Sequence, residues 1–250
     1  MQSPTLNPTQ HKAARIAGFG YLAIIVCGIF AELIIRSSLI EPGDAAATAR
    51  NIIDSEGLFR ISIASDFVML TFDALVGVAL FVVFRPFNNT LAVLATVFRA
   101  VHTAMYGVVL LALLFIVQLL SGAEYVSAFS PSQVDALTLL AADVHGFGYT
   151  LALMFFAVHV GILAYLVVAS GYLPKVIGYL LFFASAGYLV DGFAQLLLDN
   201  YAHYENTFAM VVFGPAFVGE LALGAWLMLK GVKSPAQRSG TLAAPGLQSS

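Results

Sequence analysis

Charge and recognisable chemical motifs are what this sequence has little of. Only 10% of its 250 residues are Asp, Glu, Lys or Arg, whereas a soluble domain has roughly 25%. The single cysteine, Cys27, excludes an intramolecular disulfide, and the histidines lack zinc-finger spacing. We find no P-loop, no dinucleotide fingerprint, no HExxH pair and no nucleophilic serine or cysteine motif. A net charge of -3 without a long basic run gives no indication of a nucleic-acid partner.

Apolar residues are abundant instead, at 60% of the chain, and the mean hydropathy is +0.91. A helix of about 20 apolar residues crosses a bilayer. Six runs reach this length, at residues 16–40, 61–84, 91–120, 144–170, 176–198 and 208–229. The sequence therefore predicts an all-α, polytopic bundle of six transmembrane helices in the lipid bilayer, forming one domain over residues 16–230. Residues 1–15 are expected to be an N-terminal arm and residues 231–250 a disordered tail.

The distribution of positive charge predicts the orientation of the bundle. Seven of the 11 Lys and Arg residues fall in the N-terminal arm, the second and fourth connections and the tail. These segments share one side of a six-span bundle, and loops rich in Lys and Arg stay in the cytoplasm. We therefore expect both termini to be cytoplasmic.

Two loops on the opposite side are expected to contain short helices at the membrane surface. The first has Asp44 as a plausible N-cap before an Ala-rich helix that ends near Gly57. The second has Ser130 as N-cap and Pro131 at the first helical position. Its apolar residues recur at helical spacing over residues 130–140, so we expect it to lie along the interface before the fourth span begins.

Buried polar residues stand inside the predicted spans. Asp66 and Asp73 are seven residues apart, nearly two helical turns, so they share one face. Heights of about 1.5 Å per residue, measured from the inner ends of the spans, separate these residues into two tiers. The middle tier, at roughly 15–20 Å, contains Asp73, Arg99, His102, His159 and Glu220. The outer tier, at roughly 25–31 Å, contains Glu32, Arg36, Asp66 and Asp191, and His145 comes near the outer interface.

Asp73 and Arg99 are expected to form a buried ion pair. The short connection between the second and third spans makes these spans antiparallel neighbours, and the two residues lie at nearly the same height. An ionised side chain at mid-membrane costs at least about 3 kcal/mol, so it should be paired or neutralised. Glu220 leaves two acids for one fixed base. The excess requires a protonated carboxyl, a protonated His102 or His159, or a bound cation.

Each of these groups also has a purely structural interpretation. Asp73 and Arg99 can simply lock two helices together, and Asp191 can hydrogen-bond a neighbouring helix. Glu32 and Arg36 are one turn apart and can form an interfacial pair. A buried histidine is more often a hydrogen-bond partner than a ligand. The number of such groups exceeds what helix docking requires, so a functional site is the working hypothesis.

Five stretches of the chain resemble a known family: "ARIAGFGYLAIIVCGIFAELIIRSSLIEPGDAAATARNI", "LFRISIASDFVML", "DVHGFGY", "SGYLPKVIGYLL" and "LVDGFAQLLL". They are similar to bacterial multi-pass membrane proteins that are known only as a domain of unknown function. The resemblance covers most of the chain, from about residue 14 to residue 232. It implies a bacterial or archaeal host and a location in the cytoplasmic membrane, and it implies no activity.

Three classes of function follow from the sequence. The leading one is binding or transport of a small polar solute or ion from the outside, with proton coupling through the carboxylates. Its mouth would be lined by Glu32, Asp66 and Asp191, and its floor by Asp73, Arg99 and Glu220. The second is a membrane-embedded enzyme with a metal at His145 or a haem between His102 and His159, and the third is a structural or assembly subunit.

No cofactor and no metal are expected, and no catalytic motif supports an enzyme. His145 and His159 are 14 residues apart on one helix, about 21 Å, and cannot share a metal. The sequence leaves the solute and the oligomeric state undetermined.

Overall fold

The computed structural model describes residues 7–233, without the side chains of residues 202, 205, 206, 209 and 213. Apart from residues 231–233, the tail predicted to be disordered lies outside the described residues. Six helices are long and apolar enough to cross a membrane, which confirms the all-α bundle of six spans. They cover Pro8–Leu39, Glu56–Phe84, Asn89–Leu119, Pro131–Ser170, Lys175–Leu197 and Met210–Leu229. The protein is therefore a multi-pass membrane protein.

The first and last spans are each built from consecutive helical pieces. The first joins α1 (Pro8–Gly28), the π-helical η1 (Ile29–Arg36) and α2 (Ser37–Leu39), and the last joins the π-helical η3 (Ala209–Phe213) to α9 (Gly214–Leu229). The short helix α8 (Tyr201–Phe208) precedes η3. The other four spans are single helices: α4 (Glu56–Phe84), α5 (Asn89–Leu119), α6 (Pro131–Ser170) and α7 (Lys175–Leu197).

The loop after the first span contains the expected short helix, α3 (Ala45–Asp54). Asp44 caps it, since its Oδ1 accepts a hydrogen bond from the backbone N–H of Ala47 at 2.8 Å. The helix ends at Asp54 rather than near Gly57, and α4 begins at Glu56. The second span, α4, therefore starts five residues before the predicted apolar run at residues 61–84, because the polar residues at its outer end belong to the same helix.

The prediction of a separate interfacial helix over residues 130–140 is wrong. The cap itself is as expected, with Pro131 in the first turn, the Ser130 hydroxyl accepting from the N–H of Gln133 and the Gln133 side chain accepting in return. The helix then runs without interruption for 40 residues to Ser170, about 60 Å and twice the thickness of the hydrocarbon core. Ala141 of this helix and Ile52 of α3 belong to one buried cluster, so this part of α6 packs against α3.

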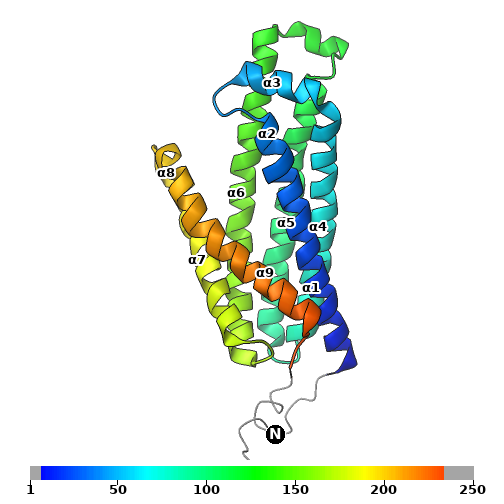
Figure 1. The fold of residues 1–250 in the computed structure, drawn as a ribbon, viewed down its shortest axis with the longest axis vertical. Coiled ribbons are helices and arrows are strands. Elements are labelled where there is room, and N and C mark those ends of the chain that lie inside the picture. Colours follow the sequence, from blue (N-terminus) through cyan, green and yellow to red (C-terminus); the bar gives the residue numbers. More distant parts are fainter. Residues whose placement is uncertain (1–6, 234–250) are drawn as a thin grey trace, which may run out of the picture.

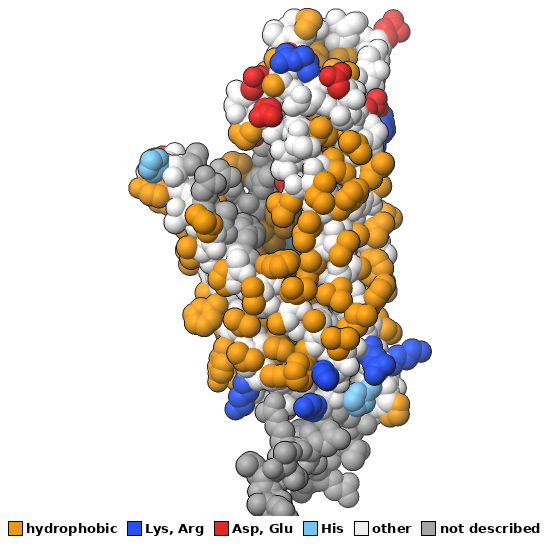
Figure 2. All heavy atoms as spheres, in the orientation of Figure 1, with side chains coloured by type: hydrophobic (Ala, Val, Ile, Leu, Met, Phe, Trp, Pro, Cys, Tyr) orange, Lys and Arg blue, Asp and Glu red, His pale blue; other side chains and the backbone are white. Residues whose placement is uncertain are grey.

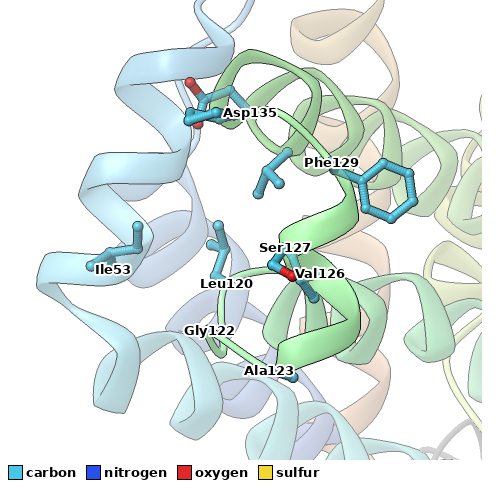
Figure 3. A pocket seen from close by; sticks show the side chains of 10 residues that line it. Ile53, Leu120, Gly122, Ala123, Val126, Ser127, Phe129 and Asp135 are labelled. Atoms are coloured by element: carbon cyan, nitrogen blue, oxygen red, sulfur yellow. The ribbon is translucent and has the colours of Figure 1, made fainter.

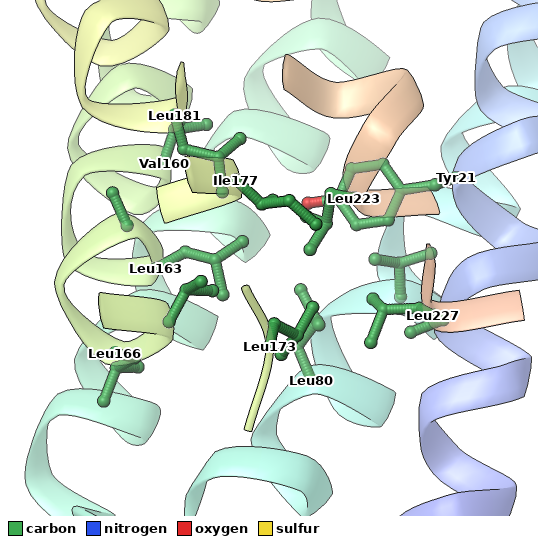
Figure 4. Packing of buried hydrophobic residues seen from close by; sticks show 14 of the residues in the cluster. Tyr21, Leu80, Val160, Leu163, Leu166, Leu173, Ile177, Leu181, Leu223 and Leu227 are labelled. Atoms are coloured by element: carbon green, nitrogen blue, oxygen red, sulfur yellow. The ribbon is translucent and has the colours of Figure 1, made fainter. Parts of the chain in front are cut away.

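The spans α1, α4, α5 and α6 form the main bundle, and α7 packs on α6 (Figure 1). α9 crosses the bundle obliquely and packs on α1 and α7, whereas α8 packs mainly on α7 and η3 at the splayed end of this pair. A buried apolar cluster fills the space between α1, α4, α6, α7 and α9 (Figure 4). Figure 4 shows Leu80, Leu173, Leu223 and Leu227 directed toward one another at its centre.

Charge is separated between the two ends of the molecule (Figure 2). The end that holds the beginning of α1 and the end of α9 carries basic side chains, and apolar side chains cover the surface between the ends. The opposite end, around α3, carries most of the acidic side chains visible on this face, together with a few basic ones. We call these the basic end and the acidic end.

Close backbone contact joins the first and last spans at Gly18. A Cβ atom added at Gly18 would lie 2.3 Å from the backbone nitrogen of Met228 and 2.7 Å from the carbonyl oxygen of Gly224. Small residues allow such approach between transmembrane helices. The glycine is required here because both obstructing atoms belong to the backbone of α9 and have no rotamer to change.

Replacing Gly18 by Ala is expected to lower the free energy of unfolding by about 1–3 kcal/mol, since the α1–α9 contact must open to admit the methyl group. Thermal unfolding of the protein in mild detergent measures this. Gly146→Ala is the matched control, because a Cβ there meets nothing within 4 Å, and it should leave stability unchanged or raise it by about 0.5–1 kcal/mol. Equal stability of the two variants would contradict the close contact.

Candidate functional site

The ion pair predicted between Asp73 of α4 and Arg99 of α5 is present at the centre of the bundle. Arg99 is 1% exposed, and its Nη2 donates to Asp73 Oδ1 at 2.6 Å. Its Nε donates to the backbone carbonyl of Asp73 at 3.0 Å, and its Nη1 donates to the Tyr21 hydroxyl of α1 at 2.8 Å. The rings of Tyr21 and Phe156 also lie against the guanidinium, with centroids 4.8 and 5.3 Å from Cζ. One buried cation thus joins four spans.

His159 of α6 completes the surroundings of Arg99. Its Nδ1 lies 2.8 Å from the carbonyl oxygen of Ala95, and its Nε2 lies 3.0 Å from Arg99 Nη1. A carbonyl oxygen only accepts, so Nδ1 carries the hydrogen, and Nε2 accepts from the guanidinium. Both ring nitrogens are therefore occupied. This geometry argues against a haem held between His102 and His159, because the lone pair that would bind iron already accepts from Arg99.

The second oxygen of the Asp73 carboxylate faces two other donors. The Thr103 hydroxyl donates to Oδ2, and Nδ1 of His102 lies 3.4 Å from the same atom. Since a carboxylate oxygen only accepts, His102 Nδ1 carries a hydrogen. Nε2 of His102 is buried and has no hydrogen-bond partner among the described residues. A buried polar atom without a partner requires an explanation.

Glu220 of α9 lies next to this network and not inside it. Its Oε1 accepts a hydrogen bond from the Tyr188 hydroxyl of α7 at 2.7 Å. Arg99 and Asp73 lie close enough for their charges to act on Glu220, although neither is its hydrogen-bond partner in the described part of the chain. Unlike Asp73, Glu220 is partly exposed. It is therefore the more exposed carboxylate of the middle tier.

The outer tier is organised around a second buried cation, Arg36 of η1. Its Nη1 donates to Asp66 Oδ2 of α4 at 2.5 Å, and its Nε donates to Glu32 Oε2 at 2.7 Å. Arg36 and Asp66 are buried, whereas the Glu32 side chain is 56% exposed. The π-helical turn of the first span supplies both Glu32 and Arg36, and such turns are frequent at functional sites.

Aromatic rings connect the two tiers. The Phe156 ring lies 4.9 Å from the ring of His102 and 6.1 Å from the ring of Tyr188, centroid to centroid. Tyr106, one turn further along α5, stacks on His102 at 6.4 Å and lies 5.0 Å from Tyr149. Tyr149 lies within electrostatic reach of both Glu32 and Glu220. The two tiers are therefore parts of one interior region.

Two predicted site residues stand apart from these ion pairs. Asp191 of α7 accepts a hydrogen bond from the Tyr201 hydroxyl of α8 at 2.8 Å, so it ties α8 to α7. His145 of α6 packs beside Tyr106 at 5.9 Å, and its Nε2 is a second buried nitrogen without a partner in the described chain. The predicted outer tier thus divides, with Arg36, Asp66 and Glu32 meeting and Asp191 placed on another face.

Each tier contains one arginine and two carboxylates. Arg36 faces Asp66 and Glu32, and Arg99 faces Asp73 with Glu220 nearby. When all four carboxylates are ionised, each tier therefore carries one uncompensated negative charge. The carboxylates with the greater exposure, Glu32 and Glu220, are the ones that do not form the buried pairs.

The side chains that sequence reasoning missed are hydroxyl and aromatic groups. Tyr21, Thr103, Tyr188 and Phe156 do not stand out in an apolar helix, because burying them is inexpensive compared with burying a charge. The sequence did indicate Thr103, because it stands one helical turn after Arg99 and therefore lies on the same face of the helix. Tyr21 and Tyr188 gave no comparable signal, since their partners lie on other spans.

A separate pocket of about 360 Å³ opens at the acidic end, between α3, η2 (Glu124–Ala128) and the start of α6 (Figure 3). Its lining is mostly apolar, with Ile53, Leu120 and Phe129 around one acidic side chain, Asp135. None of the polar residues described above contributes to it. Among residues 7–233, no three His, Cys, Asp or Glu side chains come together as a metal site.

Comparison with known proteins places the chain in a family. Residues 16–231 match the family described as "Domain of unknown function (DUF4386)". The chain belongs to this family. It is also 29% identical over 172 residues to an "Uncharacterized protein" of Archaeoglobus fulgidus, an alignment that covers 69% of this chain and 85% of that protein. No solved structure matches. The family resemblance noted in the sequence is thus confirmed, and the family's description names no activity.

Removing the Asp73 carboxylate is expected to lower the free energy of unfolding by about 3–5 kcal/mol, because Arg99 then remains buried without its counter-ion. Unfolding of Asp73→Ala in detergent measures the loss. The double variant Asp73→Leu with Arg99→Met should recover much of it, since no uncompensated charge remains. Glu56→Ala, which breaks the exposed pair with Arg60, is the control and should cost less than about 1 kcal/mol. Strictly additive losses in the double variant would contradict the pairing.

Proposed function

We propose that this DUF4386 protein binds a small polar solute or ion in the charged interior of its bundle and carries it across the cytoplasmic membrane, coupled to protons. The observation that carries this proposal is the excess of carboxylates over arginines in both tiers. A charge inside a membrane protein that no partner neutralises marks an ion, proton or substrate pathway by default. Glu220 and Glu32 are the groups that a solute or a proton would neutralise.

Access to this interior is supported by the shape of the α7–α9 side. Figure 2 shows a hollow between the splayed α8 end and the main bundle, on the side toward the acidic end. Glu32 and Glu220 are the more exposed acids of the two tiers.

Solute binding should depend on Glu220. Purified protein in mild detergent is tested by thermal unfolding against a panel of inorganic cations, amines, amino acids, sugars and carboxylic acids. At least one class should raise the unfolding temperature, and the same solute should drive proton flux in proteoliposomes that contain a pH-sensitive dye. Glu220→Gln should weaken binding at least about tenfold, since it removes a charged acceptor.

The control for this experiment is Glu56→Gln, which changes an exposed carboxylate outside the two tiers and should leave binding and flux unchanged. Asp73→Asn should abolish flux together with the middle-tier pair. If no panel member stabilises the protein and no flux arises, or if Glu220→Gln behaves like wild type, the proposal is wrong.

The orientation is part of the proposal. The segregation of Lys and Arg at the basic end supports cytoplasmic termini (Figure 2). Green fluorescent protein fused after residue 250 should therefore fluoresce in the host cell, and alkaline phosphatase fused there should be inactive. Phosphatase inserted at Gly122, in the connection at the acidic end, should be active. The reverse pattern would contradict the orientation.

A further inference from the structure

The two buried arginines have no free face for an anionic solute. Arg99 donates to Asp73, Tyr21 and His159, and two aromatic rings lie against its guanidinium. Arg36 is 2% exposed and donates to two carboxylates. A carboxylate or phosphate solute would have to displace a protein carboxylate from a buried ion pair, which is costly in a low-dielectric interior. An anion therefore does not fit this site.

Hydrogen-bond acceptors, by contrast, remain available in the middle tier. Glu220 uses its Oε1 for the Tyr188 hydroxyl and is partly exposed. His102 is 6% exposed. Its Nδ1 faces the Asp73 carboxylate, and Nε2 is buried without a partner in the described chain. Glu220 takes a donor, and in the neutral form of the His102 ring Nε2 takes one too. A ligand that satisfies them must bring N–H or O–H groups, and the charge of Glu220 favours a cation.

Aromatic rings lie next to both groups. The Phe156 ring lies beside the ring of His102 and beside the ring of Tyr188, the partner of Glu220. Tyr106 and Tyr149 continue the aromatic wall toward the outer tier. Aromatic faces beside a carboxylate attract organic cations, since the ring quadrupole and the negative charge act together. A bare inorganic ion would gain nothing from this carbon-rich wall and prefers a shell of several oxygens.

We infer that the solute of the middle tier is an organic ammonium ion with N–H groups, which donates to Glu220 and to His102 Nε2 and places its carbon body against the aromatic wall. The inference rests on the proposed function, because it names the solute class of the same site. It also explains why a histidine is buried beside an ion pair with one ring nitrogen unused.

A matched series of compounds that share a four-carbon chain tests the inference on the full-length protein in mild detergent: butylammonium, butyltrimethylammonium, butanol and butyrate. Binding is measured by thermal unfolding over a range of concentrations. Butylammonium should bind at least about tenfold more tightly than butyltrimethylammonium, which has the charge but no N–H to donate. Butanol and butyrate should not stabilise the protein.

The variants assign the contacts. Glu220→Gln should weaken butylammonium binding at least about tenfold, and His102→Phe should remove its advantage over butyltrimethylammonium. His203→Phe, at an exposed histidine of α8, and Glu56→Gln are the controls and should leave the series unchanged. If His102→Phe does not fold, the wild-type series still decides the question, because its charge and N–H contrasts need no variant.

Failure of this inference is distinguishable from failure of the proposed function. Equal binding of the two ammonium compounds, or preference for butyrate or butanol, would overturn the assignment of an N–H cation. A Glu220-dependent response to a sugar or carboxylic acid of the panel, with no response to butylammonium, would overturn it too and leave solute binding in place. If no compound of the panel and none of the series stabilises the protein, both the inference and the proposed function are overturned.

Discussion

The buried pair of Asp73 and Arg99 is the interaction on which the interior of this bundle depends. A charge in the hydrocarbon region is tolerated only when it is paired and hydrogen-bonded. Here a single guanidinium is satisfied by groups from three other helices, including Tyr21 and His159. Arg99 therefore fixes where α1, α4 and α6 meet α5. A polar network of this kind stabilises the protein only when it is complete, so each member has to stand at this depth.

The same requirement explains the outer tier, where Arg36 holds Asp66 in the interior and Glu32 at a more exposed position. The π-helical η1 presents Glu32 and Arg36 to α4, and the last span also begins with a π-helical turn, η3. η1 packs against α1 and α4, whereas η3 packs against α7 and α9. Since family membership carries no known activity, function has to be argued from these charges and not from analogy.

Most of the fold was predictable because it depends on patterns along the chain. Span length and hydropathy predicted six helices, and helical rise placed Asp73 and Arg99 at one height, so their pairing followed from a short connection. The prediction of a separate helix over residues 130–140 failed, because the signals that start a helix cannot show where its axis turns. There α6 packs against α3, and a local pattern does not contain such a contact between distant segments.

By itself, the sequence determined the class of this protein, its six spans, its charge asymmetry and the depth of its ionisable residues, since all of these follow from hydropathy and a constant rise per residue. The tertiary structure alone decided which groups are paired. It showed that Asp191 bonds Tyr201 and not Arg36, that Tyr188 holds Glu220, and that His102 keeps one nitrogen unused. The physical reason is that depth along a helix is a one-dimensional quantity, whereas hydrogen bonding depends on helix rotation and lateral packing, which only the assembled bundle fixes.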